Sequence, residues 1–163
     1  MSIAICPGSF DPITLGHLNI IRRSSKIFDK VIVCIMYNST KTSPMFSVEE
    51  RVEMARKATE KYPNVSVESS SGLLAEYAKQ HDGAVIVKGL RAASDFEYEF
   101  QMNLINKKIN PQLETMFLTS DVKYTFLSSS VVREMARYGA DLTGFVPDEI
   151  KEEIEESGGQ NNG

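Results

Sequence analysis

Short apolar runs alternate with amphipathic segments along most of the chain. The first run, residues 3–6, stops at a Pro-Gly pair, and residues 15–28 then carry apolar side chains at helical spacing. Residues 31–36 form a continuous β-branched run, which is typical of a strand buried on both faces. The same patterns predict further strands at 65–67, 84–87 and 115–119, and further helices at 47–61, 73–80, 94–108, 131–138 and 148–156.

Two of the predicted helix starts carry a capping signature. Ser47 and Ser94 are each followed three residues later by glutamate, an arrangement in which both side chains bond the first turn of a helix. The repeated alternation of strand and helix predicts an α/β fold, a doubly wound parallel five-stranded sheet with helices on both faces. We assign residues 1–156 to a single domain and expect residues 157–163, which are Ser, Gly, Gln and Asn, to form a disordered tail.

Composition narrows the class of protein. A chain of 163 residues that is 42% hydrophobic is long enough to bury one core. The net charge of −4 argues against a general nucleic-acid binder, which carries a basic excess. No apolar run reaches membrane-spanning length, and Gly8, Asp11 and Pro12 interrupt the region where a secretory signal is apolar, so we expect a soluble, cytoplasmic protein. Cys6 and Cys34 fall in predicted strands and are expected to be buried free thiols.

The loop after the first strand has the features of an anion site. Thr14 is the predicted N-cap of the next helix, which places Gly16 and His17 in a first turn whose backbone N–H groups lack intrahelical partners. Gly8 and Gly16 allow a phosphate to approach the backbone closely. The ordinary alternative is a turn glycine, a capping threonine and a packed histidine. The loop matches neither the P-loop nor the dinucleotide fingerprint.

Cations and helix starts follow the other predicted strands as well. Lys41 comes after the second strand, Lys88 and Arg91 come after the fourth, and three serines at 128–130 open a helix after the fifth. Doubly wound sheets bind ligands beyond the carboxyl ends of their strands, where the strand order reverses. Taken singly, these residues have ordinary explanations as solvated cations and capping serines. Together they predict a polyanionic ligand with more than one phosphate.

The order of the short motifs along the chain resembles that of a known superfamily. The motifs are GSFDP at 8–12, TLGH at 14–17, GLR at 89–91 and SSSVVRE at 128–134. They resemble the nucleotidyltransferases with a His/Thr-x-Gly-His signature, and within that superfamily the chain is most similar to the bacterial phosphopantetheine adenylyltransferases. The segments PMF at 44–46 and DFEYE at 95–99 add to this resemblance, which runs from about residue 3 to residue 147.

The resemblance implies a Rossmann-like fold and a particular reaction. An enzyme of this family would transfer AMP from ATP to 4′-phosphopantetheine and give dephospho-CoA and pyrophosphate, the penultimate step of coenzyme A biosynthesis. The resemblance also implies Mg²⁺ bound with ATP, a homohexamer, and CoA as a feedback ligand. Because the attacking phosphate is already anionic near neutral pH, the reaction needs no general base, and the sequence offers no convincing nucleophile–base pair.

Site residues are also implied by the resemblance. His17 would be the catalytic residue that contacts the reacting phosphates, Lys41 would bridge the two substrates, and Leu74 would lie in the pantetheine pocket. The set implied for ATP is Ser9, Phe10, His17, Gly89, Leu90, Arg91, Glu99, Tyr124, Thr125, Phe126, Leu127, Ser128, Ser129 and Ser130. The set implied for the acceptor is Ser9, Lys41, Leu74 and Lys88.

The chain departs from the family at Lys88, where relatives usually carry arginine. Lysine keeps the charge but lacks the planar fork that grips phosphate with two bonds, so we expect a weaker contact with the acceptor phosphate. Thr14 stands where many relatives have a first histidine, which favours the phosphopantetheine enzymes over cytidylyltransferases. The protonation state of His17 stays open, because a helix N-terminus disfavours the imidazolium and a triphosphate favours it.

Three other functions stay open from the sequence. A sister nucleotidyltransferase would act on nicotinate mononucleotide or glycerol phosphate, a sensor would bind ATP without releasing pyrophosphate, and a flavodoxin-like electron carrier would be yellow. The presence of His17, Lys41 and Arg91 together disfavours the sensor and the carrier, because adenine binding alone does not need such a cluster. Without the resemblance, Leu74 would be assigned to the core and Glu99 to a solvated helix face.

Overall fold

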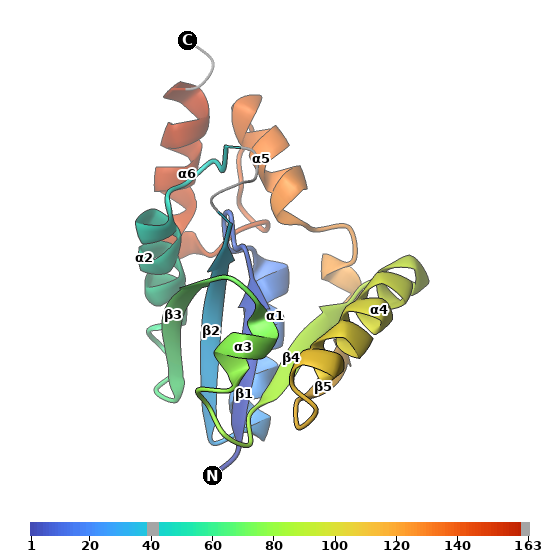
Figure 1. Ribbon diagram of the computed structural model, residues 1–163. Coiled ribbons are helices and arrows are strands. Elements are labelled where there is room, and N and C mark those ends of the chain that lie inside the picture. The colour runs from blue at the N-terminus through green and yellow to red at the C-terminus, as the bar shows by residue number, and fades with distance from the viewer. Residues whose placement is uncertain (39–42, 161–163) are drawn as a thin grey trace.

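The computed structural model describes residues 1–38 and 43–160, and a five-stranded parallel sheet forms its centre (Figure 1). The strands stand in the order β3-β2-β1-β4-β5. They are β1 (Ile3–Gly8), β2 (Lys30–Tyr37), β3 (Val65–Ser71), β4 (Val85–Leu90) and β5 (Glu114–Thr119). The helices are α1 (Leu15–Ile27), α2 (Val48–Thr59), α3 (Leu74–Ala78), α4 (Ala93–Ile109), α5 (Ser129–Arg137) and α6 (Asp148–Gln160), with a 3₁₀ turn, η1 (Val122–Tyr124). The predicted α/β class and five-stranded parallel sheet are confirmed.

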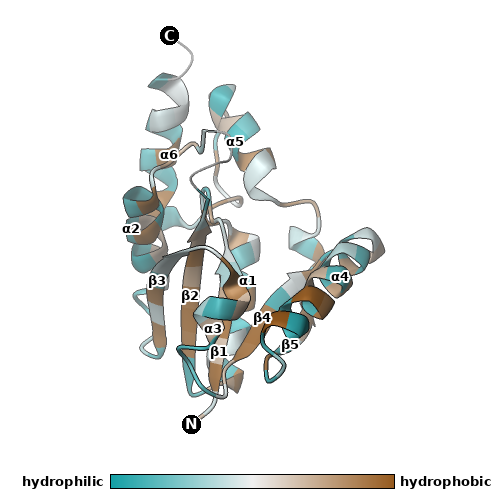
Figure 2. Ribbon diagram, in the orientation of Figure 1, coloured by the Kyte–Doolittle hydropathy of each residue, from teal (hydrophilic) through white to brown (hydrophobic). Residues whose placement is uncertain are grey.

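Alternate residues of the central strand face opposite sides of the sheet, as the geometry of a strand requires. Ala4 and Cys6 are buried in a large cluster with side chains of α1, α2, α5 and α6. Ile5, between them, is buried in a smaller cluster with α3. Helices therefore cover both faces, and Figure 2 shows the hydrophobic colour that runs along the central strands. The continuous apolar run of β2 follows from the same two-sided burial.

The order of the strands reverses beside β1, and there the sheet opens. From β1 the chain builds β2 and β3 on one side and then crosses to β4 and β5 on the other. β1 pairs with β4 only at Ala4–Val85 and Ile5–Ile86, so the carboxyl-terminal halves of these two strands diverge. This is the place where doubly wound sheets bind ligands.

Two strands are longer than the apolar pattern indicated. β3 continues beyond Val67 through residues 68–71, which pair with β2. β4 continues beyond Val87 through residues 88–90, which pair with β5. In both places the backbone of a neighbouring strand supplies the hydrogen bonds, so the end of the strand depends on its partner rather than on hydrophobicity.

The predicted capping box at Ser94 is wrong, whereas the one that opens α2 is confirmed. α4 begins at Ala93, and its N-cap, Ala92, makes no side-chain cap bond. Asp95 instead accepts a hydrogen bond from the backbone N–H of Arg91 at 3.3 Å, and its carboxylate lies 3.6 Å from Arg91 Nε. The short-range contact with Arg91 therefore takes the place of the expected cap.

The C-terminal helix is longer than the composition of the tail suggested. α6 extends to Gln160, so residues 157–160 are helical, and residues 161–163 lie outside the described residues. Gly158 is buried, and a Cβ atom there would lie 2.3 Å from the carbonyl oxygen of Ala136 in α5. Close contact between α5 and α6 therefore requires glycine at a position that looks like a helix breaker in the sequence.

Both cysteines are buried and free, as the sequence predicts. Burial raises the pKa of Cys6 to about 12 and that of Cys34 to about 11. Both side chains therefore stay thiols at neutral pH, and neither acts as a nucleophile.

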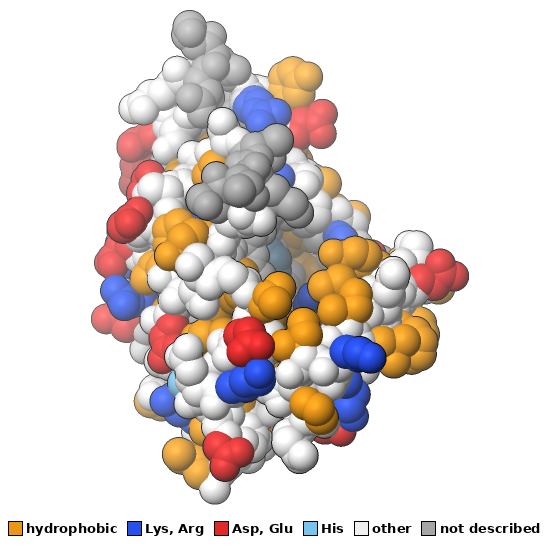
Figure 3. Space-filling model, in the orientation of Figure 1, with side chains coloured by type: hydrophobic (Ala, Val, Ile, Leu, Met, Phe, Trp, Pro, Cys, Tyr) orange, Lys and Arg blue, Asp and Glu red, His pale blue; other side chains and the backbone are white. Residues whose placement is uncertain are grey.

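α4 differs from the other long helices because it buries none of its 17 residues. Its exposed side chains include large apolar ones, and in Figure 3 hydrophobic side chains gather over this helix. The exposed apolar residues of α4 are Phe96, Tyr98, Phe100, Leu104 and Ile105. None of the described helices has the length and apolar character needed to cross a membrane.

We predict that Gly158→Ala destabilises the protein by about 1–3 kcal/mol, because the added methyl group would force α6 away from the backbone of α5. Gly159→Ala is the matched control, since a Cβ atom at Gly159 would meet nothing within 4 Å. Alanine favours a helix by up to about 1 kcal/mol over glycine, so the control should be neutral or slightly stabilising. Urea denaturation of both variants measures the difference, and equal stabilities would contradict the packing described here.

Candidate active site

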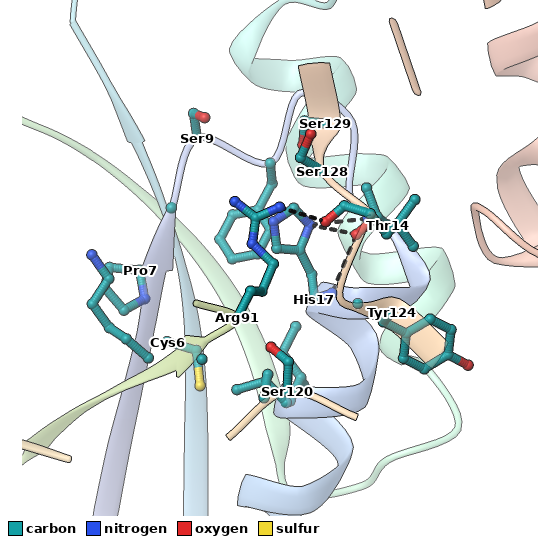
Figure 4. Close-up of a pocket in the computed structure, with 18 of the residues that line it drawn as sticks. Cys6, Pro7, Ser9, Thr14, His17, Arg91, Ser120, Tyr124, Ser128 and Ser129 are labelled. Atoms are coloured by element: carbon teal, nitrogen blue, oxygen red, sulfur yellow. Dashed lines mark hydrogen bonds between the residues drawn. The ribbon is translucent and has the colours of Figure 1, made fainter. Parts of the chain in front are cut away.

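A cavity of about 300 Å³ lies where β1 and β4 diverge, and we call it the central cavity. Figure 3 shows the surface hollowed on this side, with a histidine visible at its base. Its walls come from the ends of β1 and β4, the first turn of α1 and the segment that leads into α5 (Figure 4). Its lining includes Ser9, Phe10, Thr14, Gly16, His17, Lys88, Gly89, Arg91, Tyr124, Leu127, Ser128 and Ser129.

The loop after β1 is held in place by the buried carboxylate of Asp11. Its two oxygens accept hydrogen bonds from the backbone N–H groups of Met45 and Phe46, each at 2.9 Å. Asp11 is only 6% exposed, and a buried carboxylate is costly unless it is hydrogen-bonded in this way. The bonds join the loop after β1 to the loop after β2, so two walls of the site are fixed relative to each other.

Arg51 of α2 fastens the same two loops through their carbonyl oxygens. Its Nη1 donates to Ser9 O at 3.0 Å, and its Nε donates to Phe46 O at 3.1 Å and to Ser47 O at 3.3 Å. The residue is 5% exposed. A guanidinium suits this place because several fixed N–H groups can reach several carbonyls at once.

α5 holds the loop after β1 from the opposite side. Arg133 Nη1 donates to the backbone carbonyl of Asp11 at 2.7 Å, and Nη2 of the same guanidinium donates to Ser130 Oγ at 3.2 Å. Ser129 Oγ donates to the carbonyl of Pro12 at 2.8 Å. The N-terminus of α5 is thereby brought against the N-terminus of α1.

His17 points into the central cavity in a fixed orientation (Figure 4). The backbone N–H of Thr14 donates to His17 Nδ1 at 3.0 Å, and Thr14 Oγ1 accepts from the backbone N–H of His17 at 3.3 Å. Thr14 is therefore the N-cap, as predicted. The His17 side chain accepts a hydrogen bond from the N-cap backbone, as glutamate does in the common capping box. Because Nδ1 accepts a hydrogen bond, the neutral ring carries its proton on Nε2, which is left to donate.

The protonation state of His17, which the sequence left open, follows from its surroundings. Burial, and then the positive charge of Arg91, lower the pKa of His17 to about 4. The imidazole is therefore neutral at pH 7 in the free protein. It offers one N–H donor to a ligand and does not add a full positive charge.

Arg91 reaches across the central cavity to the segment that precedes α5. Its Nη1 donates to the carbonyl of Leu127 at 2.9 Å. Ser128 is the N-cap of α5 and accepts from the backbone N–H of Val131 through its side chain. The first N–H groups of a helix lack intrahelical acceptors, so a guanidinium and a helix N-terminus border the same space. This combination is suited to binding phosphate.

Lys88 stands at the border between the central cavity and two further cavities, of about 560 and 410 Å³, that adjoin α3. We call these two the α3 cavities, and both are lined by Leu74, Lys88 and Tyr98. Lys88 Nζ lies 2.8 Å from a carboxylate oxygen of Glu99, and both side chains are largely buried. One ammonium group therefore faces both sides of the site while it is paired with α4.

The structure brings together most, but not all, of the residues predicted for ATP. His17, Arg91 and seven others of the predicted set line the central cavity. Leu90, Thr125, Phe126 and Ser130 do not line it, and Glu99 lines the smaller α3 cavity instead. Gly89 lines the central cavity, and a Cβ atom there would lie 2.9 Å from the Ile20 side chain, so this glycine also allows α1 to pack on β4.

Of the residues predicted for the acceptor, Ser9 and Lys88 line both the central cavity and the larger α3 cavity. Leu74 lines both α3 cavities, and it is partly buried against the smaller apolar cluster rather than fully enclosed in it. Lys41 lies outside the described residues.

The residues that hold the site together were not identified from the sequence. Asp11, Arg51 and Arg133 all lie within the quoted motifs or close to them, but each also binds a group 34 to 122 residues away along the chain. No local pattern marks such contacts. Tyr98, inside the DFEYE segment, is 62% exposed and lines both α3 cavities, a position that the sequence did not indicate.

Known proteins resemble this chain in sequence and in fold. Residues 5–135 match the family described as cytidylyltransferase-like. A phosphopantetheine adenylyltransferase of Caldanaerobacter subterraneus subsp. tengcongensis is 52% identical over 156 residues, which cover 96% of this chain and 97% of the relative. One from Dictyoglomus turgidum is 54% identical over 153 residues, covering 94% and 95%. A solved structure from Vibrio parahaemolyticus, named for a nicotinate-nucleotide adenylyltransferase, shares the fold with a TM-score of 0.69 at 19% identity, covering 96% of this chain and 93% of that chain.

We predict that His17 makes stability depend on pH. In the unfolded chain its pKa returns towards the ordinary value of 6.5, so the unfolded state takes up a proton that the folded state takes up only near pH 4. Stability is therefore lost as pH falls from about 6.5 towards 4, by about 1–2 kcal/mol between pH 7 and pH 5. His17→Asn, whose Oδ1 can accept from Thr14 N–H, should lose this component in urea denaturation at the two pH values. An unchanged pH dependence in the variant would show that His17 is not its source.

Proposed function

The chain belongs to the phosphopantetheine adenylyltransferase family, and on that premise we propose that it transfers the adenylyl group of ATP directly to 4′-phosphopantetheine. The observation that carries this proposal is the junction of the cavities. The central cavity and the larger α3 cavity share Pro7, Gly8, Ser9 and Lys88 in their linings. A nucleotide in the first and an acceptor in the second would meet at the end of β1.

The proposed chemistry is a single in-line displacement. An oxygen of the acceptor phosphate attacks the α-phosphorus of ATP, the bond between this phosphorus and the oxygen that bridges to the β-phosphate breaks, and pyrophosphate leaves with those electrons. The product, dephospho-CoA, keeps the adenylyl group. The attacking oxygen needs no base, since a phosphate monoester is largely ionised at neutral pH. The protein's part is to position the groups and to stabilise charge.

His17 is the proposed catalytic residue. Its bond with Thr14 N–H leaves Nε2–H directed to the space where the α-phosphate would lie. Such a donor is already oriented and does not have to reorganise as negative charge moves towards the leaving group, which is the source of oxyanion-type stabilisation. Bound phosphates would raise the pKa of His17 from its value in the free protein. Neutral or protonated, the ring keeps the donor at Nε2.

The remaining ATP-binding residues are proposed on the same grounds. Arg91 and the N-terminus of α5 supply the cationic wall for the departing phosphates. Other members of the proposed set are Ser9, Phe10, Gly89, Leu90, Glu99, Tyr124, Thr125, Phe126, Leu127, Ser128, Ser129 and Ser130. Those among them that do not line the central cavity rest on the resemblance alone.

On the acceptor side, Lys88 is proposed to contact the phosphate of 4′-phosphopantetheine and Leu74 to contact its pantetheine arm. The α3 cavities combine apolar walls with amide side chains, among them Met36, Met102, Asn103 and Asn106, and an arm with methyl groups and amides would suit such walls. The proposed role of Lys41, to bridge the two substrates, rests on the resemblance.

Mg²⁺ is proposed to arrive with ATP. Among residues 1–38 and 43–160, no group of three His, Cys, Asp or Glu side chains is placed to hold a metal ion. Mg²⁺ often keeps several waters and binds through substrate phosphates, where it neutralises their charge. We therefore assign it no protein cage.

A homohexamer, with CoA as a feedback ligand, completes the proposal. The exposed apolar residues of α4 support assembly, because large apolar patches on the surface mark protein–protein contacts. The feedback ligand rests on the resemblance, since CoA shares the pantetheine arm with the acceptor.

We predict pyrophosphate release from ATP and Mg²⁺ when 4′-phosphopantetheine is added, and none with nicotinate mononucleotide or glycerol phosphate. His17→Asn keeps the cap bond but loses the Nε2 donor, and kcat should fall by about 10²–10³-fold while ATP binding persists. His17→Gln places an amide donor near the position of Nε2 and should retain more activity. Release with another acceptor would overturn the substrate, and ATP binding without release from any acceptor would favour a sensor.

We also predict that Lys88→Arg improves acceptor use. The guanidinium could keep Glu99 and still present N–H groups to phosphate, whereas the single ammonium of Lys88 is shared between them. The KM for 4′-phosphopantetheine should fall about threefold or more, and Lys88→Met should raise it. Lys79→Arg, at the exposed C-cap of α3, is the control for the substitution itself. An unchanged KM in Lys88→Arg would contradict the expected weakness of lysine.

A further inference from the structure

α3, which forms a wall of both α3 cavities, depends strongly on tertiary contacts for its stability. It has five residues, and its N-cap, Leu73, makes no side-chain cap bond. A helix of this length does not persist without tertiary contacts. Gly72, two residues before α3, has a φ of +101°, which glycine adopts readily because it has no Cβ. Side-chain sterics therefore do little to restrain the chain where it enters α3. What α3 touches therefore decides where its residues lie.

The inner side of α3 carries one polar anchor to the sheet. Tyr77 is 5% exposed, and its hydroxyl donates a hydrogen bond to Glu68 Oε2 on β3. Glu68 lies opposite Cys34 in the register of β2 and β3, so the oxygen that accepts this hydrogen bond is carried by a strand of the sheet. Burial and the bond to the carboxylate raise the pKa of Tyr77, so the hydroxyl keeps its proton and stays the donor.

The hydrogen bond between Tyr77 and Glu68 differs from the other contacts of α3 because it joins the helix to β3. Asn110, just after α4, donates from Nδ2 to the Ala75 carbonyl at 3.2 Å and ties the start of α3 to α4. Ala75 and Ala78 pack on the apolar cluster of that face but offer only methyl groups. Tyr77 is the large side chain by which α3 reaches β3, and it follows Leu74 by one helical turn.

We propose that Tyr77 and Glu68 are positioning residues for the acceptor. Their hydrogen bond fixes α3 on the sheet and thereby sets the place of Leu74 in the walls of the α3 cavities. The identity of the acceptor rests on the proposed function, but the positioning of α3 does not. His81 lies beside the pair, with Nε2 3.6 Å from the same Glu68 oxygen, and serves as a second contact rather than as the anchor.

Tyr77→Phe tests the proposal by removing only the hydroxyl. The KM for 4′-phosphopantetheine should rise about tenfold, which corresponds to the loss of one hydrogen bond to a charged group, while kcat and the KM for ATP stay within about twofold. Tyr62→Phe is the matched control, since Tyr62 lies near α2, away from the α3 cavities, and should change none of the three constants. Equal changes in both KM values would overturn a role confined to the acceptor.

Variants of Glu68 and His81 separate the hydrogen bond with Tyr77 from the contact with His81. Glu68→Gln keeps an oxygen that can accept from Tyr77 and should stay within about twofold of the unchanged protein, whereas Glu68→Leu should match Tyr77→Phe. His81→Gln should have little effect. If Glu68→Gln and His81→Gln both raise the KM as much as Tyr77→Phe does, the contact between Glu68 and His81 is the anchor and the proposal fails.

Hydrogen exchange tests the positioning without any substrate. In Tyr77→Phe, amides of residues 76–81 should exchange about tenfold faster, while amides of α1 keep their rates. This result would stand even if the protein used a different acceptor, so a failure of the proposed function and a failure of this inference are distinguishable. Unchanged exchange in α3 would overturn the inference.

Discussion

The buried carboxylate of Asp11 is the interaction on which the rest of the site depends. A charged group at 6% exposure is tolerated only because two backbone N–H groups of the loop after β2 bind it directly and the Arg133 guanidinium lies 3.8 Å away. Those partners come from the loop after β2 and from α5, so the charge cannot be satisfied unless three parts of the chain meet. Arg51 is a buried cation that is satisfied in a similar way. It donates to backbone carbonyls of the loop after β1 and of the loop after β2.

This framework explains how a site for a polyanion can contain a neutral histidine. Arg91 and the N-terminus of α5 supply the positive field, while burial, together with the charge of Arg91, keeps a second proton off the His17 ring. The backbone N–H of Thr14 then fixes which nitrogen donates. The positive charge comes from a guanidinium and a helix N-terminus, and the directed hydrogen-bond donor is a histidine whose orientation is set by the helix cap.

The two sides of the site are built differently. The central cavity is bordered by β1, β4 and α1, which are rooted in the largest apolar cluster. The α3 cavities are bordered by a five-residue helix and by α4, which buries no residue. Specific polar contacts, such as Tyr77 with Glu68 and Lys88 with Glu99, therefore matter more on that side, because apolar packing fixes less of it.

The sequence by itself determined the alternation of strands and helices, the parallel sheet, the N-cap at Thr14 and the edge at which His17, Lys88 and Arg91 gather. These features follow from periodicity and from short-range backbone chemistry, which a single stretch of chain contains in full. Only the tertiary structure decided the ends of β3 and β4, the helical state of residues 157–160, the neutral form of His17 and the anchoring roles of Asp11 and Arg51. Each of these depends on a partner distant in sequence: a neighbouring strand, the carbonyl of Ala136 or a buried charge. A local sequence pattern does not show which distant group will form a hydrogen bond with a residue or will bury it away from water.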